Sequence, residues 1–547
     1  MDDGVVWMGG SVAQLILEQL AAWGVRAVYG YPGETILPLL DALGRQDRIA
    51  FYATRHEASA AFMASAEAKL FGRLGVCLAH AGPGLANLVN GLADAYLDRA
   101  PVLAISGQVA RGKIGTDSVQ YLDEGELVRP VAASSALLAE PGAAVEVLTK
   151  AMRTSLTRGT VAHVAIPQDL FAQEVDLEAR PPEPYLTAAP SQSKEDLGRL
   201  AALLNEAQRP MILVGRGARG QGAAVLQLAE EWGAGIVTTM PAKGVVPGGH
   251  PLVLGGLGEG GSEAATECLA AADILLVLGA TWWPEGFVPK QIAVVQIDAD
   301  PAGIGRHIPV RYGYVGRIEA VMPDLLRGVE AQIRGAWLDR IVEARRRWLA
   351  RIEAEAGRSS FPLAPQRVVR ALERVLALDA VVALDVGDHT LWFNRVFAGE
   401  RHEVLTSGTW RSMGFALPAA IQAKLNAPGR QVVAVVGDGG LNMSLPELAT
   451  AAQYGAAVKI VVFDNGCLAM ERNRMLVQGM EPKAAHLVNP DFAACAGACG
   501  LRGHRVNRVE ELEEVLGLAL AEEGPSLVDV PVEPAVVPTA PVVAALA

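Results

Sequence analysis

The sequence is poor in aromatic residues, in cysteine and in clustered positive charge. Phe, Trp and Tyr make up 5% of its 547 residues, and its five cysteines are odd in number and scattered: Cys77, Cys268, Cys467, Cys495 and Cys499. Such a set does not form a disulfide framework, so we expect a reducing cytoplasm. A net charge of −13 and a pI near 5.3 exclude a typical nucleic-acid binder, because phosphate contacts need clustered Lys and Arg.

Long uninterrupted apolar runs are also lacking. Near the start, the apolar positions are interrupted by Gln14, Glu18 and Gln19. We therefore expect neither a signal peptide nor a membrane span there. Residues 536–547 are apolar but short and broken by proline, without the basic face of a membrane-surface helix. We interpret them as a tail lying on another subunit and expect no membrane contact.

Glycine and apolar residues are abundant, with 58 glycines and 51% hydrophobic residues. A length of 547 residues favours about three domains. Short buried-strand patterns alternate with helical spacing, which predicts α/β domains with parallel, doubly wound sheets. The Pro-rich stretches around 180–193 and 357–365 divide the chain into domains at 1–180, 194–335 and 360–534, followed by a tail at 535–547.

The stretch at 432–467 reads as strand, glycine turn, helix and strand. The apolar runs at 432–436 and 459–463 suit buried parallel strands, and they end near Asp438 and Asn465 on one carboxyl edge, where open α/β sheets bind ligands. Mg²⁺ prefers such oxygen ligands. Gly437, Gly439 and Gly440 predict a tight turn whose amides can approach phosphate, with a helix at 446–454. A bare GDG turn would equally suit an ordinary βαβ crossover.

GDG with an Asn 27 residues after its Asp resembles the thiamin diphosphate fingerprint of the acetolactate synthase and pyruvate oxidase family. TRHEASAAFMA at 54–64, AGPGLANLVNGLADAYLDRAPVLAISGQ at 81–108 and GTDSVQYLD at 115–123 follow in the order that this family shows. The resemblance covers nearly the whole chain. It implies pyrimidine-binding, central FAD or nucleotide-type, and diphosphate-binding domains, in that order.

By this resemblance, Mg²⁺ anchors the cofactor diphosphate and is held by Asp438, Asn465 and the backbone carbonyl of Cys467, with Leu468 beside them. Asp464 stands where relatives usually carry a second Asn. Three further cofactor contacts are expected from Gly387, Asp388 and His389. Met413 would separate the two cofactor rings, although a methionine there would otherwise be ordinary core filling.

The resemblance also assigns catalytic roles. Glu57 would hydrogen-bond the aminopyrimidine ring and relay a proton, although on its own it reads as a first-turn helix carboxylate. Gln120 would face substrate, and Val119 replaces a usual Phe. His80 stands where relatives carry Ser or Thr; we interpret it as a packed, hydrogen-bonded His, with a pocket proton carrier as the alternative. The remaining cleft residues are Pro32, Gly33, Pro83 and Asn87.

Arg474 stands where acetolactate synthases carry Trp. It would hold the carboxylate of an acceptor, or it lies on a solvated helix face; we weigh these readings equally. The central domain resembles the flavin-binding domain of pyruvate oxidases, which makes FAD a possible cofactor. The residues that carry this resemblance are Gly215, Gly217, Arg219, Lys243, Thr281, Trp282 and Asp298.

The resemblance implies thiamin diphosphate- and Mg²⁺-dependent decarboxylation of pyruvate or a related 2-oxo acid. The resulting enamine would pass to a second 2-oxo acid, as in acetolactate synthase. An FAD-dependent pyruvate oxidase, a non-oxidative decarboxylase and a binding protein that keeps the cofactor residues stay open. Family members also imply a homodimer or homotetramer with active sites between subunits.

Overall fold

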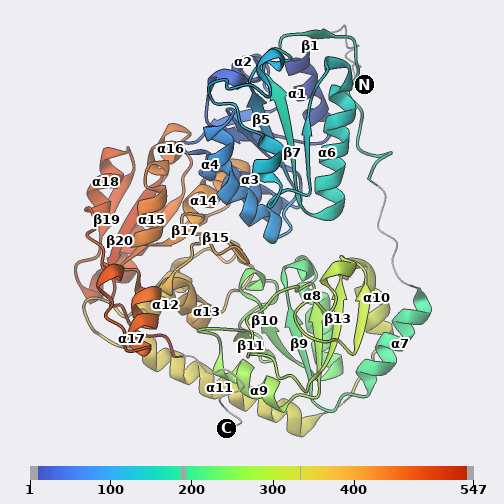
Figure 1. Ribbon diagram of the computed structural model, residues 1–547. Helices are drawn as coiled ribbons and strands as arrows, with labels where there is room; N and C mark the ends of the chain where they lie inside the picture. The colour runs from blue at the N-terminus through green and yellow to red at the C-terminus, as the bar shows by residue number, and fades with distance from the viewer. Residues whose placement is uncertain (1–9, 187–192, 333, 539–547) are drawn as a thin grey trace. The chain divides into compact units, whose positions relative to one another are not determined.

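The computed structural model describes residues 10–186, 193–332 and 334–538. The described chain forms two compact units. Unit 1 contains the described residues up to 186 together with Ser407–Pro428 and Met443–Ala456, and unit 2 contains the remainder. Within these units lie three six-stranded parallel sheets, one for each predicted α/β domain, which confirms the predicted fold class (Figure 1). The exact domain boundaries stay predictions.

The first sheet lies in unit 1 and has the order β3-β2-β4-β5-β7-β6. Its strands are β2 (Ala27–Gly30), β3 (Ala50–Ala53), β4 (Gly75–Ala79), β5 (Val102–Gln108), β6 (Ser134–Leu137) and β7 (Val161–Pro167). The helices around it are α1 (Val12–Ala22), α2 (Leu37–Gly44), α3 (Glu57–Phe71), α4 (Pro83–Leu97), α5 (Glu124–Val128) and α6 (Ala144–Arg158). Ser11 and Gln14 form a capping box that starts α1.

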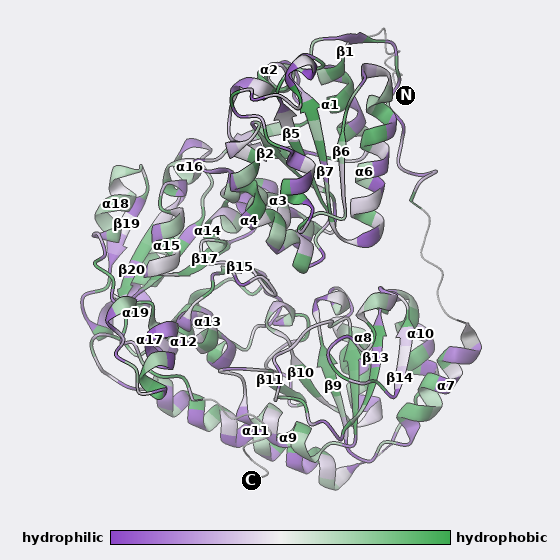
Figure 2. Ribbon diagram, in the orientation of Figure 1, coloured by the Kyte–Doolittle hydropathy of each residue, from purple (hydrophilic) through white to green (hydrophobic). Residues whose placement is uncertain are grey.

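The second sheet belongs to unit 2 and has the order β11-β10-β9-β12-β13-β14. Its strands are β9 (Pro210–Val214), β10 (Gly235–Thr238), β11 (Val253–Gly256), β12 (Ile274–Leu278), β13 (Ala293–Asp298) and β14 (Tyr312–Val315). The accompanying helices are α7 (Lys194–Asn205), α8 (Gly222–Trp232), α9 (Glu263–Ala271) and α10 (Ile318–Gly328). Strand β9 is coloured hydrophobic over most of its length and is buried throughout, as expected for a strand covered on both faces (Figure 2).

The third sheet has the order β16-β15-β17-β18-β20-β19. Its strands are β15 (Val381–Leu384), β16 (Glu403–Thr406), β17 (Val432–Gly437), β18 (Lys459–Asp464), β19 (Arg502–Arg505) and β20 (Ser526–Pro531). The helices of unit 2 in this region are α11 (Gly335–Ala356), α12 (Pro365–Val375), α13 (Asp388–Val396), α17 (Ala469–Val477), α18 (Phe492–Ala498) and α19 (Leu512–Ala521). Helix α15 (Asp438–Ser444) begins in this unit, whereas α14 (Ala416–Asn426) and α16 (Glu447–Gln453) belong to unit 1.

One local prediction was wrong, and one pair of strands was not predicted. The glycines after β17 do not form a separate turn, because helix α15 begins at Asp438 itself and precedes the predicted helix at α16. The sequence also gave no sign of the two-stranded antiparallel pair of β1 (Gly10–Ser11) with β8 (Glu174–Val175). The interpretation of residues 536–547 as a tail falls mainly on 539–547, which lie outside the described residues.

Two simple findings bear on the environment of the protein. All five cysteines are free thiols, in agreement with the absence of a disulfide framework. Across residues 10–186, 193–332 and 334–538, no helix combines the length and the apolar character needed to span a membrane.

Candidate functional site

Asp438 and Asn465 meet at one edge of the third sheet. They follow β17 and β18, which are adjacent parallel strands with Gly437 in register with Phe463. The Asp438 carboxylate is 3% exposed, and its Oδ2 accepts hydrogen bonds from the amides of Asn465 (3.3 Å) and Gly466 (2.8 Å). The structure therefore places these two strand ends next to each other, as the sequence predicts.

Asn489 joins this pair to the neighbouring acid. Its side-chain amide donates one hydrogen bond to Asp438 Oδ2 and one to Asp464 Oδ1, both at 2.8 Å. Its oxygen accepts from Asn442 Nδ2 at 3.0 Å, which fixes the orientation of the amide. Burial raises the pKa of the Asp438 carboxyl, and the charge of Asp464 raises it further. The edge thus concentrates oxygen ligands and negative charge.

The chain beyond Asn465 is held as an extended segment. An isolated antiparallel β-bridge joins the backbones of Cys467 and His486. Next to it, Leu468 N donates to Ala485 O, and Leu487 N donates to Gly466 O. Asn465 Oδ1 accepts from the Cys467 amide at 3.2 Å, so this side chain folds back over the segment. Burial raises the pKa of the Cys467 thiol to about 11, which makes the sulfur an unreactive group at neutral pH.

Asp388 and His389 begin helix α13 at the end of β15, the strand next to β17. Both are buried, and burial raises the pKa of Asp388 to about 6 and lowers that of His389 to about 4. Asp388 Oδ2 accepts from Trp392 Nε1 at 2.8 Å. The buried Nε2 of His389 has no hydrogen-bond partner in the described structure, as expected where a polar ligand completes a site.

Glu57 opens helix α3 in unit 1, and His56 caps that helix. Glu57 is 9% exposed, and its Oε2 accepts a hydrogen bond from Asn87 Nδ2 of helix α4 at 2.9 Å. The approach to α3 is fixed by α16 of the same unit: Arg55 N donates to Glu447 Oε1 at 3.0 Å. The structure therefore brings together the predicted proton-relay residue and a predicted cleft residue, with Glu57 Oε1 on the other side of the carboxyl group.

His80 and Gln120 form a second pair in unit 1. His80 Nε2 lies 2.8 Å from Gln120 Oε1, and its Nδ1 lies 2.9 Å from the hydroxyl of Thr35. Gly84 lies between His80 and Glu57. A Cβ added to Gly84 would lie 3.2 Å from His80 Cβ and 3.4 Å from Glu57 Oε1. Gly33 packs on the His80 ring in the same way, with its added Cβ at 2.4 Å from His80 Cβ.

The segment that carries Met413 is bound to helix α4 within unit 1. Asp98 accepts from the amides of Gly408 (2.8 Å) and Thr409 (2.7 Å). Asn90 donates to Ser412 Oγ at 3.1 Å and lies three residues after Asn87, on the same face of α4. Met413 is thereby held next to the helix face that contacts Glu57.

Family models match all three regions of the chain. "Thiamine pyrophosphate enzyme, N-terminal TPP binding domain" matches residues 10–127, the central-domain model matches 197–325, and the C-terminal TPP binding domain model matches 385–530. The chain belongs to the thiamine pyrophosphate enzyme family. Thiamine pyrophosphate is thiamin diphosphate, so the family is the one that the sequence resembles.

Relatives match over almost the full length of this family member. It is 37% identical over 523 residues to "Putative thiamine pyrophosphate-containing protein YdaP" of Bacillus subtilis, with 95% of this chain and 91% of the relative covered. It is 33% identical over 538 residues to pyruvate oxidase of Lactiplantibacillus plantarum, covering 94% and 87%. It is 32% identical over 532 residues to the acetolactate synthase isozyme 1 large subunit of Escherichia coli, covering 95% and 94%.

The donor set of this thiamine pyrophosphate enzyme fits a hard cation with a diphosphate. Asp438 supplies a carboxylate, Asn465 an amide oxygen and Asp464 a second nearby charge. Burial first, and the Asp464 charge second, raise the pKa of Asp438, and a bound dication would favour its ionised form. Among the described residues, no group of three or more His, Cys, Asp or Glu side chains is placed to hold a metal ion by itself. The assignment of individual ligands stays a prediction.

The predicted flavin residues follow strands of the second sheet and lie at or just beyond the carboxyl ends of those strands. Gly215 follows β9 and Thr281 lies just beyond β12, at the point where the strand order reverses. However, an added Cβ on Gly215 would lie 2.2 Å from Gly279 O, so close packing already accounts for this glycine. Gly217 packs on Gly279 in the same way, and Asp298 accepts from the Asp300 amide at 2.9 Å. Flavin binding therefore stays a prediction.

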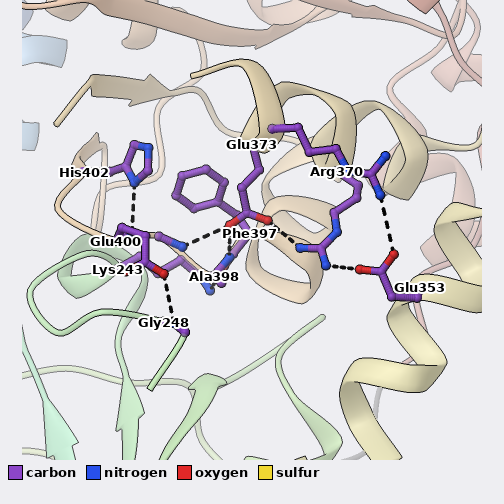
Figure 3. Close-up of polar contacts among 12 residues, drawn as sticks. Lys243, Gly248, Glu353, Arg370, Glu373, Phe397, Ala398, Glu400 and His402 are labelled. Carbon is purple, nitrogen blue, oxygen red and sulfur yellow. Dashed lines mark hydrogen bonds and ion pairs between the residues drawn. The ribbon is translucent and has the colours of Figure 1, made fainter. Parts of the chain in front are cut away.

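Lys243, which follows β10, has a partner outside the second sheet. Its buried Nζ donates to Phe397 O at 2.6 Å, just after helix α13 (Figure 3). Burial lowers the pKa of Lys243 to about 8, with Glu373 opposing this shift. Glu373 in turn accepts from the amides of Ala398 (2.7 Å) and Gly399 (3.1 Å). This lysine thus joins the central region to the loop after α13, a role that the sequence did not suggest.

Arg474 lies on helix α17 with 46% of its side chain exposed. Its guanidinium lies 3.1 Å from Glu471 and 3.8 Å from Glu259. Two carboxylates therefore compete with any acceptor for this side chain, which favours the solvated-face interpretation over the acceptor role.

Thr35, Glu124 and Asn489 were missed by the sequence analysis. Thr35 contacts His80, Glu124 accepts from the Gly82 amide at 3.2 Å, and Asn489 bridges Asp438 and Asp464. Each lies far along the chain from its partner and in no motif that the sequence analysis singled out. An Asn before Pro490 signals only a turn.

Proposed function

We propose that this thiamine pyrophosphate enzyme decarboxylates pyruvate or a related 2-oxo acid, with Mg²⁺, and transfers the remaining fragment to a second 2-oxo acid. The observation that carries the proposal is that two carboxylates are each buried and each hydrogen-bonded to an asparagine. Glu57 accepts from Asn87, and Asp438 accepts from the amide of Asn465. Glu57 is nearly buried and has one carboxylate oxygen bound by Asn87, which is the environment that a proton-relay carboxylate needs. Further support comes from the names of two relatives, one a pyruvate oxidase and the other an acetolactate synthase.

Thiamin diphosphate supplies, when bound, a carbon nucleophile and an electron sink that allow a 2-oxo acid to lose CO2. The chain supplies proton control and position. Asn87 occupies Glu57 Oε2, so Oε1 is the oxygen that would be left to exchange a proton with a bound cofactor. Met413, on its anchored segment, would contact the cofactor rings, and Asp438 and Asn465 would hold the cation that binds the diphosphate. Gln120 orients the substrate.

The test is product analysis with ¹³C-pyruvate. Purified protein with thiamin diphosphate and Mg²⁺ should release CO2 and form one 2-acetolactate from two pyruvates, and omission of either cofactor should stop both events. Acetaldehyde as the main product would instead make the protein a non-oxidative decarboxylase. Acetate together with a bound flavin, seen in the absorption spectrum, would make it an oxidase. No CO2 release would overturn the proposed function.

We also propose that the active unit is at least a homodimer with shared sites. The support is the resemblance to family members that place the cofactor between two subunits. Mixing inactive Glu57→Gln with inactive Asp438→Ala subunits under exchange should restore part of the activity. Absence of recovery in proven mixed dimers would place each site within one chain. The cytoplasmic location stays a prediction from the cysteines.

A further inference from the structure

The orientation of the Gln120 side chain follows from the hydrogen bonds around His80. The backbone N–H of Thr35 points at His80 Nδ1 at 3.2 Å, and a backbone amide can only donate. The Thr35 hydroxyl accepts from the Ala81 amide at 3.0 Å, so its own proton is left to donate to the same Nδ1 at 2.9 Å. Nδ1 therefore carries a lone pair and accepts from Thr35.

A neutral ring whose Nδ1 accepts carries its proton on Nε2. That N–H lies 2.8 Å from the Gln120 side chain and needs an acceptor, which the oxygen of the amide provides. The NH2 group of Gln120 is then turned away from His80. Gln120 is itself exposed, so this NH2 group is available to a ligand.

The surrounding backbone is built to hold this arrangement. A Cβ on Gly33 would lie 2.4 Å from His80 Cβ, and one on Gly107 would lie 2.3 Å from Thr35 Oγ1, so neither neighbour leaves the two side chains room to move. Gly82 has a φ of +61°, and a Cβ there would lie 2.5 Å from Gln120 O. Gln120 has a φ of +64°, a conformation that a residue with a side chain rarely adopts without support.

Glu124 supplies that support from the far side of the loop. Its Oε1 accepts from the Gly82 amide at 3.2 Å and its Oε2 from Ser106 Oγ at 2.5 Å. Ser106 and Ser135 bind the two nitrogens of the buried His163, each at 2.8 Å. This chain of hydrogen-bonded groups ties the Gly82 turn to strands β5, β6 and β7, so the loop with Gln120 is anchored although its side chain is exposed.

We propose that His80 is a positioning residue that turns the NH2 group of Gln120 toward the 2-oxo acid substrate, and that Thr35 fixes the tautomer of His80 on which this depends. The inference rests on the proposed function for the identity of the ligand. A 2-oxo acid offers only oxygen acceptors, its carboxylate and its keto oxygen, and an NH2 donor is complementary to both. His80 then acts as a fixed donor and not as a proton carrier.

The first test is the tautomer of His80, which does not depend on turnover. Long-range ¹H–¹⁵N correlation spectra of the holoenzyme with ¹⁵N-labelled histidine, assigned with His80→Gln, should show a proton on Nε2 and none on Nδ1. A proton on Nδ1, or on both nitrogens, at neutral pH would overturn the proposal, because Gln120 would then present its oxygen or lack a defined orientation.

The second test separates substrate contact from a structural role. Gln120→Leu removes the donor and should raise the KM for pyruvate about 10-fold, whereas Gln120→Glu adds repulsion and should raise it about 100-fold. Thiamin diphosphate affinity and kcat should change less than 3-fold in both. Lys113→Gln is the matched control, since it changes the net charge by the same amount on the same exposed loop and should leave KM unchanged.

Equal KM values for wild type and both Gln120 variants would overturn the substrate contact. An enzyme without activity on any 2-oxo acid, yet with His80 protonated on Nε2, would refute the proposed function and leave the His80 geometry standing. If His80→Gln fails to fold, Thr35→Val serves instead: it keeps the backbone N–H but removes the hydroxyl. Because the backbone donor stays, the variant should show a partial shift, with a minor His80 population protonated on Nδ1, and an unchanged spectrum would refute the role of the Thr35 hydroxyl.

Discussion

Lys69 neutralises two buried carboxylates, and its removal is expected to be costly. Its Nζ lies 2.7 Å from Asp94 Oδ2 and 2.7 Å from Asp98 Oδ2, and its side chain is 2% exposed. In Lys69→Met the least costly response is to protonate one carboxyl group. Bringing an acid with an ordinary pKa of about 4 into its neutral form at pH 7 costs roughly 4 kcal/mol, in line with the 3–5 kcal/mol typical of broken buried pairs.

The stability that Lys69→Met loses relative to wild type should become smaller as pH falls. Without Lys69, the folded-state pKa of a buried carboxyl is raised above its unfolded value, so stability is lost as pH rises above about 4. The difference between wild type and Lys69→Met should therefore shrink by about 1.4 kcal/mol for each pH unit between 7 and 5. Adding Asp94→Asn to the Lys69→Met variant should restore most of the lost free energy of unfolding, because one of the two buried carboxylates is then replaced by a neutral amide.

Native-state hydrogen exchange over α3 and α4 measures this free energy without requiring the whole chain to unfold in one step. Lys150→Met, at an exposed position on α6, is the matched control and should change it by less than 0.5 kcal/mol, about the limit for a surface substitution. A loss below about 1 kcal/mol at pH 7, or a loss that does not vary between pH 7 and 5, would refute the reasoning. Because Asp98 also binds Gly408 and Thr409, we expect weaker cofactor binding as well.

Three further predictions concern the cofactor edge and a buried histidine. Asp438→Ala should abolish retention of thiamin diphosphate with an unchanged circular dichroism spectrum, and unchanged affinity in titration would remove Asp438 from the metal site. Asn489→Leu should weaken Mg²⁺-dependent cofactor binding about 10- to 100-fold, since both amide donors to Asp438 and Asp464 are lost; the exposed Gln478→Leu is its control, and equal affinities would contradict the role. Burial lowers the pKa of His163 to about 4, so its contribution to stability is present above pH 6.5 and is lost as pH falls toward 4. Relative to His163→Gln, wild type should lose roughly 2 kcal/mol between pH 7 and 5 in hydrogen exchange of β5 and β7, and a constant difference would show that His163 is not held neutral.

The sheets were predictable because their strands are short, apolar and separated by clear glycine and proline signals. The strand ends at Asp438 and Asn465 were predicted on one edge, since adjacent parallel strands end on the same side of a sheet. The helix that starts at Asp438 was not, because GDGG reads locally as a turn, and tertiary packing overrides that preference.

The contacts that orient the candidate residues could not be read from the sequence. Thr35 reaches His80 across 45 positions and Asn489 reaches Asp438 across 51, and no local pattern encodes such pairings. The contact of Lys243 with Phe397 spans 154 positions and gives this residue a partner that the glycine-rich motifs around it do not suggest. Sequence patterns give the edge of a sheet, whereas side-chain partners depend on the packing of distant segments.

The most direct test of the account is hydrogen–deuterium exchange at C2 of bound thiamin diphosphate, followed by NMR after rapid acid quench. Glu57 is nearly buried, and its Oε1 is the oxygen left for the pyrimidine ring. Wild type should exchange this proton far faster than the free cofactor, and Glu57→Gln should bind the cofactor with similar affinity but slow the exchange at least 100-fold, because a neutral amide cannot relay a proton. A wild-type exchange rate in Glu57→Gln would contradict the account.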